Sequence, residues 1–154
     1  MEQRMNFYEK SQGAMKAMYA MSGYLANSPV EKRLLDLLYL RASQINGCAY
    51  CVDMHAKDLR AGGETEQRVY LLDAWRETAL YTKRERAALA WAEAVTSLPG
   101  REVPDNVYTD AREQFSDEEL IDLTMAVTTV NTYNRINIAF RVQGGSYQPG
   151  QHGK

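Results

Sequence analysis

The sequence predicts an all-α fold, and three observations point to it. Ser28, Thr82 and Ser116 are each followed three residues later by a glutamate, which is the capping-box pattern that opens helices. Apolar residues recur at helical spacing along most of the chain. No segment alternates apolar and polar residues between turn signals, so no strand is expected. With 154 residues, 45% of them hydrophobic and 25% charged, the chain is long enough for one globular domain with a hydrophobic core.

The first two predicted helices lie in the N-terminal quarter of the chain. The first covers about residues 5–24, and its regularly spaced methionines form an apolar stripe that suits either core packing or a subunit interface. The second begins at Ser28, where Pro29 occupies the first helical position and Glu31 completes the capping box. It is expected to continue to about residue 43.

The third predicted helix covers about residues 48–60. Gly47 separates it from the preceding helix, and Asn46 is a candidate N-cap. The pair Gly62-Gly63 is a strong stop signal at its C-terminus. A fourth helix is expected over about residues 65–78.

Three more helices are expected in the C-terminal half, over about residues 82–97, 105–114 and 116–140. Pro99-Gly100 ends the first of them. The β-branched run Val127–Val130 resembles a strand on composition alone. It lies within a long pattern of helical period, so a helix is predicted there.

Polar residues interrupt the longest predicted helix near its end. Asn131, Asn134 and Arg135 share one helical face. In such a position they are expected to cap neighbouring helix ends or to pair across an interface, rather than to act directly in catalysis.

A glycine-rich segment closes the chain. From Gly144 onward the sequence reads GGSYQPGQHGK, which lacks any helical or strand pattern. We therefore expect a single domain over residues 1–143 and a flexible tail over residues 144–154.

Composition excludes several classes of function. The net charge of −2 gives no basic surplus that would indicate a nucleic-acid partner. No apolar run approaches the roughly 20 residues of a membrane-spanning helix, and the first ten residues lack the apolar core of a signal peptide. The expected compartment is therefore the cytoplasm. There a Cys-x-x-Cys pair more often binds a metal or performs redox chemistry than forms a structural disulfide.

The strongest functional signal is the stretch Gly47–His55, GCAYCVDMH, which holds both cysteines of the chain and one of its two histidines. In a helix, Cys48, Cys51 and His55 share one face. Cα atoms three residues apart lie roughly 5 Å apart, a separation that a disulfide can span. The helix N-terminus favours a thiolate at Cys48, whereas the imidazole favours one at Cys51. These residues alone leave open which sulfur attacks.

Other interpretations of the pair fit the same residues. The cysteines can be buried small hydrophobic side chains. Together with His55 they can be three ligands of a zinc ion, but a structural zinc site needs four, and the remaining histidine, His152, lies in the tail. A thioredoxin-type site needs a βαβ context that a helical chain does not provide.

Asp36, the two cysteines and His55 follow a specific spacing: an acidic residue, eleven residues, Cys-x-x-Cys, three residues, then His. With this spacing, the chain resembles the alkylhydroperoxidase D-like (AhpD-like) core of the carboxymuconolactone decarboxylase superfamily. The segment Asn131–Asn137, NTYNRIN, is similar to the family's late-helix signature. The resemblance covers about residues 15–142 and implies an AhpD-like helical bundle of about six to seven helices.

The resemblance also implies an activity, that of a thiol-dependent peroxidase reducing organic hydroperoxides. Cys51 would attack the peroxide, and its sulfenic acid would condense with Cys48 to a disulfide. His55 and Asp36 would relay protons. A dithiol reductant or a reducing protein would restore the thiols. Family members use no flavin, haem or metal for this step, and one-domain relatives assemble as homodimers or trimers of dimers.

Two positions depart from the family pattern. Asp36 replaces a glutamate, and from this chain alone it also suits a solvated helix face on which it pairs with Lys32. Between the cysteines, the best-studied members carry a second histidine, whereas this chain has Ala49-Tyr50. The alternative function is therefore a redox sensor or thiol–disulfide exchange protein. A carboxymuconolactone-type decarboxylase ranks lower, because those relatives generally lack the cysteine pair.

Overall fold

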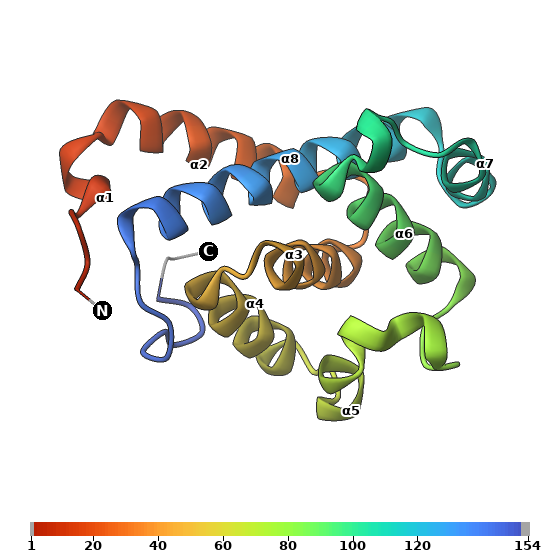
Figure 1. Cartoon of the computed structure of the whole chain (residues 1–154), viewed down its shortest axis with the longest axis horizontal. Helices are drawn as coiled ribbons and strands as arrows, with labels where there is room; N and C mark the ends of the chain where they lie inside the picture. Colours follow the sequence, from red (N-terminus) through yellow and green to blue (C-terminus); the bar gives the residue numbers. More distant parts are fainter. Residues whose placement is uncertain (1, 152–154) are drawn as a thin grey trace.

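The computed structural model describes residues 2–151, and within that range every regular element is a helix (Figure 1). This confirms the predicted all-α fold. The elements are eight α-helices and two short 3₁₀ helices, named in chain order α1 (Phe7–Lys10), α2 (Gln12–Ala26), α3 (Lys32–Asn46), α4 (Ala49–Ala61), α5 (Glu66–Tyr70), η1 (Leu72–Glu77), α6 (Lys83–Ser97), η2 (Pro99–Arg101), α7 (Asp105–Gln114) and α8 (Asp117–Phe140).

Helix α3 occupies the centre of the bundle, where α4, α6 and α8 all pack against it. The longest helix, α8, crosses the molecule with α2 alongside it (Figure 1). Helix α7 packs against α6 at one end of the bundle. At the other end, the segment that follows α8 returns to the beginning of α4 (Figure 1). The Cys-x-x-Cys motif at the start of α4 is therefore flanked by α3, α8 and the C-terminal segment.

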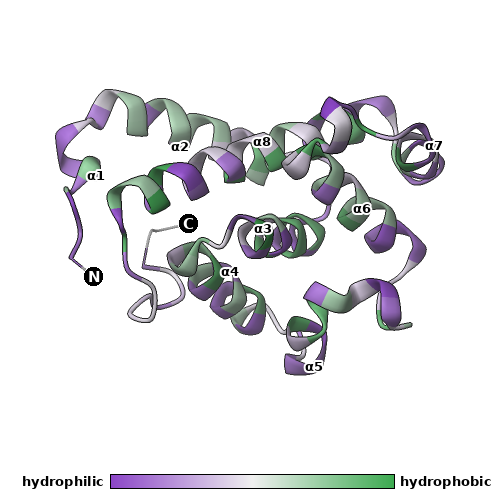
Figure 2. Ribbon diagram, viewed as in Figure 1, coloured by the Kyte–Doolittle hydropathy of each residue, from purple (hydrophilic) through white to green (hydrophobic). Residues whose placement is uncertain are grey.

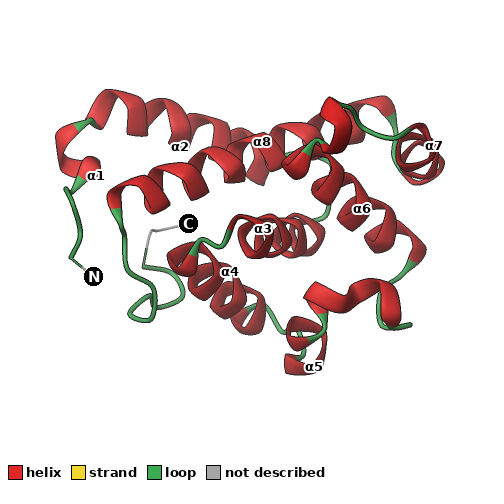
Figure 3. Ribbon diagram, in the orientation of Figure 1, coloured by secondary structure: helices red, strands yellow, loops and turns green. Residues whose placement is uncertain are grey.

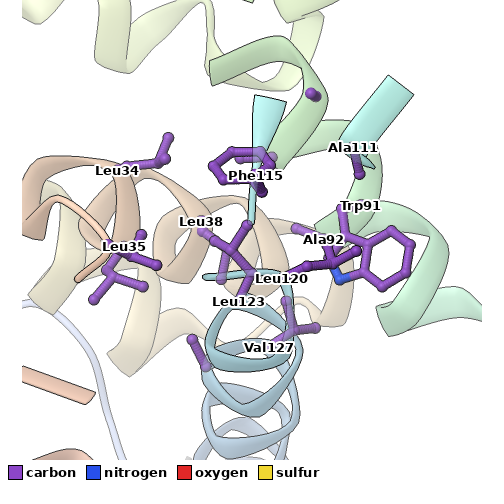
Figure 4. Close-up of a cluster of buried hydrophobic side chains, with 14 of the residues drawn as sticks. Leu34, Leu35, Leu38, Trp91, Ala92, Ala111, Phe115, Leu120, Leu123 and Val127 are labelled. Carbon is purple, nitrogen blue, oxygen red and sulfur yellow. The ribbon is translucent and has the colours of Figure 1, made fainter. Parts of the chain in front are cut away.

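Leucines explain the central position of α3, because they cover most of its circumference. On one side Leu38 packs into a cluster with Trp91 of α6 and Leu123 of α8 (Figure 4). On another side Leu37 belongs to a second cluster with Leu59 of α4. Leu37 and Leu38 have no exposed surface. Burial of each such side chain contributes about 1.5–3 kcal/mol to folding, so the two clusters fix α4 and α8 relative to α3.

Most of the remaining helices alternate green and purple along their ribbons in Figure 2, as expected of amphipathic helices that cover a core. In α6, for example, the buried residues include Ala88, Leu89 and Ala92. Among residues 2–151, no helix combines the length and the apolar character needed to cross a bilayer.

Two of the three predicted capping boxes are confirmed. Thr82 opens α6 and Ser116 opens α8, and each hydroxyl accepts a hydrogen bond from the amide of the glutamate three residues later. The box at Ser28 is wrong: α3 begins later, with Glu31 as its N-cap, and the buried Ser28 hydroxyl has no hydrogen-bond partner among the described residues. The carboxylate of Glu31 instead accepts from Arg84 of α6 at 3.0 Å. The Glu31 side chain thus pairs with α6 rather than with the backbone N–H of Ser28.

Two of the predicted helices are divided in the structure (Figure 3). The first separates into α1 and α2 at Ser11, where φ is −137° and ψ is 61°. The fourth separates into α5 and η1 at Leu71. These breaks make the number of helices larger than the six to seven expected. The β-branched run Val127–Val130 lies inside α8, as predicted.

Candidate functional site

A tight turn joins α3 to α4 and places the cysteines. Asn46 is the last residue of α3, and Gly47 caps that helix in the left-handed conformation, with φ 67° and ψ 31°. Glycine adopts this conformation without the steric cost that a side chain brings. The next residue, Cys48, is the N-cap of α4. The predicted N-cap role of Asn46 is therefore wrong, because α3 continues through Asn46 and the chain turns at Gly47.

Cys48 and Cys51 form a disulfide at the N-terminus of α4. Their Cα atoms are 5.3 Å apart, within the range that a disulfide requires. The sulfur of Cys48 accepts a hydrogen bond from the backbone N–H of Cys51 at 3.4 Å. Both residues are only 1% exposed. Because free amides at a helix N-terminus favour negative charge, either sulfur would be stabilised as a thiolate in the reduced protein.

Asn137 of α8 is a contact of the disulfide that the sequence analysis did not single out. Its side-chain Nδ2 donates a hydrogen bond to the sulfur of Cys51 at 3.3 Å. Asn137 is 3% exposed, and its Oδ1 is buried without a hydrogen-bond partner among the described residues. The sequence signal was the recurrence of asparagine every three residues near the end of α8, at positions that face α3 and α4.

The two preceding asparagines of this row hold the end of α3. Asn46 Nδ2 donates to Asn131 Oδ1 at 2.7 Å and to Asn134 Oδ1 at 2.8 Å, and Asn134 Nδ2 donates to Ser43 Oγ at 3.0 Å. Arg135 Nη1 donates back to Asn131 Oδ1 at 2.8 Å. Asn131 and Asn134 thus bind a neighbouring helix end, as the sequence predicted. Through them α8 fixes the junction that carries the cysteines.

His55 lies on α4 four residues after Cys51, which is one helical turn further along the same face. Its ring is half-buried and packs against Tyr39 of α3, with ring centroids 5.4 Å apart. Burial, assisted by the positive charge of Lys32, lowers the pKa of His55 to about 4. The imidazole is therefore neutral at pH 7 and able to accept a proton.

Asp36 lies on α3 and forms an ion pair with Lys32, as its surface interpretation predicted. Its side chain is nevertheless only 18% exposed. Burial raises the pKa of Asp36, an effect that Lys32 opposes in part. The pKa of Tyr39 is raised by burial and then by the nearby Asp36 carboxylate. Tyr39 thus borders Asp36 on its own helix and His55 on α4.

Tyr50 occupies the position between the cysteines where the best-studied relatives carry a histidine. Burial raises its pKa, so the phenol keeps its proton at neutral pH. Its ring meets the ring of Tyr147 edge-on, with centroids 6.5 Å apart. Tyr50 therefore cannot replace an imidazole as a base, and His55 is the histidine that the motif provides.

The C-terminal segment lies against the first turns of α4. Gly144 is so close to that helix that an added Cβ would come within 2.7 Å of the carbonyl oxygen of Ala49. The backbone N–H of Gly145 donates to Asp53 Oδ2 at 2.9 Å. Lys57 then pairs with Asp53 at 2.8 Å. These contacts place the segment beside the turn that contains Cys48 and Cys51.

Tyr147 anchors the same segment further along α4. Its hydroxyl donates to Asp58 Oδ1 at 2.9 Å, and its carbonyl oxygen accepts from Lys57 Nζ at 2.9 Å. Tyr147 is only 4% exposed. We expected a flexible tail over residues 144–154. Residues 144–151 make these specific contacts, residues 152–154 lie outside the described residues, and flexibility stays a prediction.

The metal alternative concerned the cysteines, His55 and His152. Within residues 2–151, no group of three or more His, Cys, Asp or Glu side chains is arranged to hold a metal ion. His152 lies outside the described residues, so its part in such a site is untested.

Sequence comparison finds relatives over most of the chain. The model of the carboxymuconolactone decarboxylase family matches residues 12–94, which include both cysteines and His55. The uncharacterized protein YdfG of Bacillus subtilis (strain 168) is 42% identical over 139 residues, covering 90% of this chain and 95% of YdfG. The uncharacterized protein YnjA of Escherichia coli (strain K12) is 27% identical over 115 residues, covering 75% of this chain and 63% of YnjA.

Solved structures share the fold. A protein of unknown function from Agrobacterium tumefaciens, proposed to be the antioxidant defence protein AhpD, has a TM-score of 0.90 at 43% identity, covering 95% of this chain and all of its own (100%). The debrominase Bmp8 has a TM-score of 0.80 at 20% identity, covering 90% of this chain and 74% of its own, which shows the fold alone. The helical bundle, the cysteine pair on α4 and the family match agree, and the chain belongs to the carboxymuconolactone decarboxylase family as an AhpD-like member.

Proposed function

We propose that the protein is an AhpD-like thiol peroxidase that reduces organic hydroperoxides through a Cys48–Cys51 disulfide cycle. The observation that carries the proposal is the disulfide at the N-terminus of α4 in a chain of this family. Two cysteines within one helical turn can exchange two electrons without large backbone motion. The 43% identity to the Agrobacterium protein proposed to be AhpD supports the same chemistry.

Cys51 is the attacking sulfur in this proposal. Its sulfur accepts a hydrogen bond from Asn137, and a thiolate accepts such a bond more strongly than a thiol or a disulfide does. Cys51 is also the cysteine that precedes His55 by one helical turn. Cys48 then resolves the oxidised sulfur. The helix N-terminus favours Cys48, whose sulfur accepts the Cys51 backbone amide, so the choice of Cys51 rests on the Asn137 contact and the imidazole.

Protons move through His55 and Asp36 in the proposed site. His55 is neutral at pH 7 and takes the proton of the Cys51 thiol, directly or through a water molecule. Its pKa of about 4 makes it a weak base, so the amide donors around the sulfur share in stabilising the thiolate. Burial raises the pKa of Asp36, which suits a carboxyl group that exchanges protons with solvent and with the site.

The cycle has three balanced steps. The Cys51 thiolate attacks the terminal oxygen of the hydroperoxide, so that an S–O bond forms, the O–O bond breaks and the alkoxide leaves as an alcohol with a proton from His55. The Cys48 thiol then attacks the sulfenic acid, forming the disulfide and releasing water. A dithiol reductant or a reducing protein gives two electrons and two protons, which restores both thiols and leaves its own disulfide. No step of the proposed cycle involves a flavin, a haem or a metal.

We further propose a homo-oligomer, either a dimer or a trimer of dimers, working in the cytoplasm. Helix α2 contains one charged residue, Lys16, and exposes Tyr19 and Tyr24 by 51% and 54%. An exposed face of this kind suits association with a second copy. The cytoplasm supports the cycle because its thiol pools re-reduce disulfides.

The test is consumption of cumene hydroperoxide by the purified protein with a dithiol reductant. We expect Cys51→Ser to abolish turnover and Cys48→Ser to stop it after one sulfenic acid has formed. Unchanged turnover in both variants would refute the proposal. Rapid disulfide formation with negligible turnover would instead indicate the redox-sensing alternative, especially if oxidation changes the oligomer size.

Reductive debromination is a second candidate. A cysteine-to-alanine variant of the debrominase Bmp8 in complex with 2,3,4-tribromopyrrole shares the fold, with a TM-score of 0.81 at 19% identity. The two thiols of this chain could balance such a reaction, replacing bromine by hydrogen and releasing bromide as the disulfide forms. Incubating the reduced protein with 2,3,4-tribromopyrrole and measuring bromide separates the two activities.

A further inference from the structure

Asn137 meets the reactive sulfur from a helix that carries no other part of the proposed relay. It lies on α8, three residues before that helix ends, and α8 is held against α3 and α4 by packing. The backbone carbonyl of Asn137 accepts the N–H of Val142 at 2.9 Å, so its main chain is fixed by the helix cap. The side chain is therefore held in place independently of α4.

The two polar atoms of the Asn137 amide have different surroundings. Nδ2 donates to the sulfur of Cys51 at 3.3 Å. Oδ1 is buried and has no hydrogen-bond partner among residues 2–151. A buried amide oxygen without a donor is costly, and such groups are uncommon in folded proteins unless a ligand or water completes them. The oxidised site thus contains one unused acceptor on the side chain that touches the attacking sulfur.

We propose that Asn137 is a catalytic residue that holds both reactants: its Nδ2 stabilises the Cys51 thiolate, and its Oδ1 accepts the O–H of the incoming hydroperoxide. The inference rests on the proposed peroxidase function and extends it to the substrate. In a hydroperoxide the terminal oxygen carries the hydrogen, and this oxygen is the one that the thiolate attacks. One amide can therefore orient the sulfur and the oxygen between which the new bond forms.

The electron and proton balance is that of the first step of the cycle. The sulfur lone pair forms the S–O bond, the O–O bond breaks, and the alkoxide takes its proton from His55. The hydrogen on the terminal oxygen stays there and becomes the hydrogen of the sulfenic acid. Asn137 gains and loses no proton, so its contribution is to position and to stabilise charge. For an oxidant that lacks an O–H group, only the stabilisation of the Cys51 thiolate by Nδ2 would speed the reaction.

The test uses a Cys48→Ser background, in which Cys51 is the remaining thiol. Iodoacetamide, which has no peroxide O–H, reports the thiolate fraction of Cys51 as a function of pH. Cumene hydroperoxide with dimedone trapping reports sulfenic acid formation on the same sulfur. Comparing the two rate constants at the high-pH plateau, where Cys51 is fully ionised, removes the effect of pKa. The ratio of hydroperoxide rate to alkylation rate then isolates the role of Oδ1.

Asn137→Ala is expected to raise the pKa of Cys51 by about one unit, a tenfold change in its acid dissociation constant. It should also lower the plateau rate ratio about tenfold or more. Asn137→Leu keeps nearly the same shape but has neither the donor nor the acceptor, so it should also raise the pKa of Cys51 and lower the ratio. This second variant keeps the test open if the alanine variant does not fold.

Thr132→Ala is the control on the same helix, since Thr132 is exposed and its hydroxyl bonds the Thr128 carbonyl of α8 rather than sulfur. It should leave the rate ratio unchanged. An unchanged ratio in both Asn137 variants would overturn the inference even if the enzyme is a peroxidase.

If the Cys48→Ser protein forms no sulfenic acid at all, the proposed function and the role of Oδ1 both fail. The alkylation pKa would still decide whether Asn137 stabilises the thiolate.

Discussion

Gly144 lies directly against Ala49 in the first turn of α4, and a Cβ on Gly144 would come within 2.7 Å of the Ala49 carbonyl oxygen. We predict that Gly144→Ala moves the C-terminal segment away from α4, because both contacting groups are backbone and neither can turn aside. The free energy of unfolding should fall by about 1–3 kcal/mol, the usual cost of overpacking. The rate at which dithiothreitol reduces the disulfide should rise.

Gly23→Ala on α2 is the matched control, because nothing lies within 4 Å of its added Cβ. It should leave the reduction rate unchanged and raise stability by up to about 1 kcal/mol through helix propensity. Thermal unfolding and a stopped-flow reduction assay measure both effects. Equal reduction rates for Gly144→Ala and the wild type would show that the segment does not shield the disulfide.

Lys32 depresses the pKa values of His55 and of Asp36 through its positive charge. Lys32→Met should therefore raise both pKa values, moving that of His55 upward from about 4. NMR titration of the imidazole protons measures this shift, with His152→Gln to assign the second histidine. Lys16→Met on the exposed face of α2 is the control and should leave the pKa of His55 unchanged. A titration that does not move in Lys32→Met contradicts the described environment of His55.

The low pKa of His55 also predicts a loss of stability in acid. The folded protein binds a proton at His55 only near pH 4, whereas an unfolded chain binds it near pH 6.5. Between these values the unfolded state holds more protons, so the free energy of unfolding should fall as the pH drops through this window. His55→Gln should flatten that slope in urea unfolding measured from pH 7 to pH 4. Equal slopes in the two proteins would argue against a lowered pKa of His55 in the folded protein.

The three serine and threonine residues of the predicted capping boxes should behave differently on truncation. Thr82→Ala and Ser116→Ala each remove a hydroxyl that accepts a helix amide, so each should cost about 1 kcal/mol of stability. Ser28→Ala removes a buried hydroxyl without a hydrogen-bond partner among the described residues, so it should be neutral or stabilising. Chemical denaturation of the three variants measures these losses in the free energy of unfolding. A cost at Ser28 equal to that at Thr82 would contradict the observed start of α3.

The sequence predicted where a helix begins when the groups that cap it lie close together along the chain. The capping boxes at Thr82 and Ser116 use groups within four residues of each other, and both formed. The box at Ser28 did not form, since α3 begins at Lys32 with Glu31 as its N-cap, and the Glu31 carboxylate pairs with Arg84, 53 residues away. Sequence patterns report near neighbours, and an ion pair between helices depends on how the helices pack.

In the candidate site, too, the sequence predicted only the residues that lie close together along the chain. Cys48, Cys51 and His55 lie within one stretch, so helical spacing was enough to bring them together. Asn137 is 86 residues from Cys51, and only the packing of α8 against α4 brings its amide to the sulfur. The anchoring of Tyr147 on Asp58, 89 residues away, was equally invisible to local pattern. A glycine-rich segment whose partners are distant looks like a loose tail in the sequence.

The peroxidase cycle is tested most directly by a thiol count on the reduced protein before and after one equivalent of cumene hydroperoxide, followed by peptide mapping. Both thiols of the chain should disappear, and one peptide should carry the bond between Cys48 and Cys51. In Cys51→Ser the remaining thiol should persist. Two intact thiols after treatment, or loss of the thiol in Cys51→Ser at the wild-type rate, would contradict a peroxidase cycle that begins at Cys51.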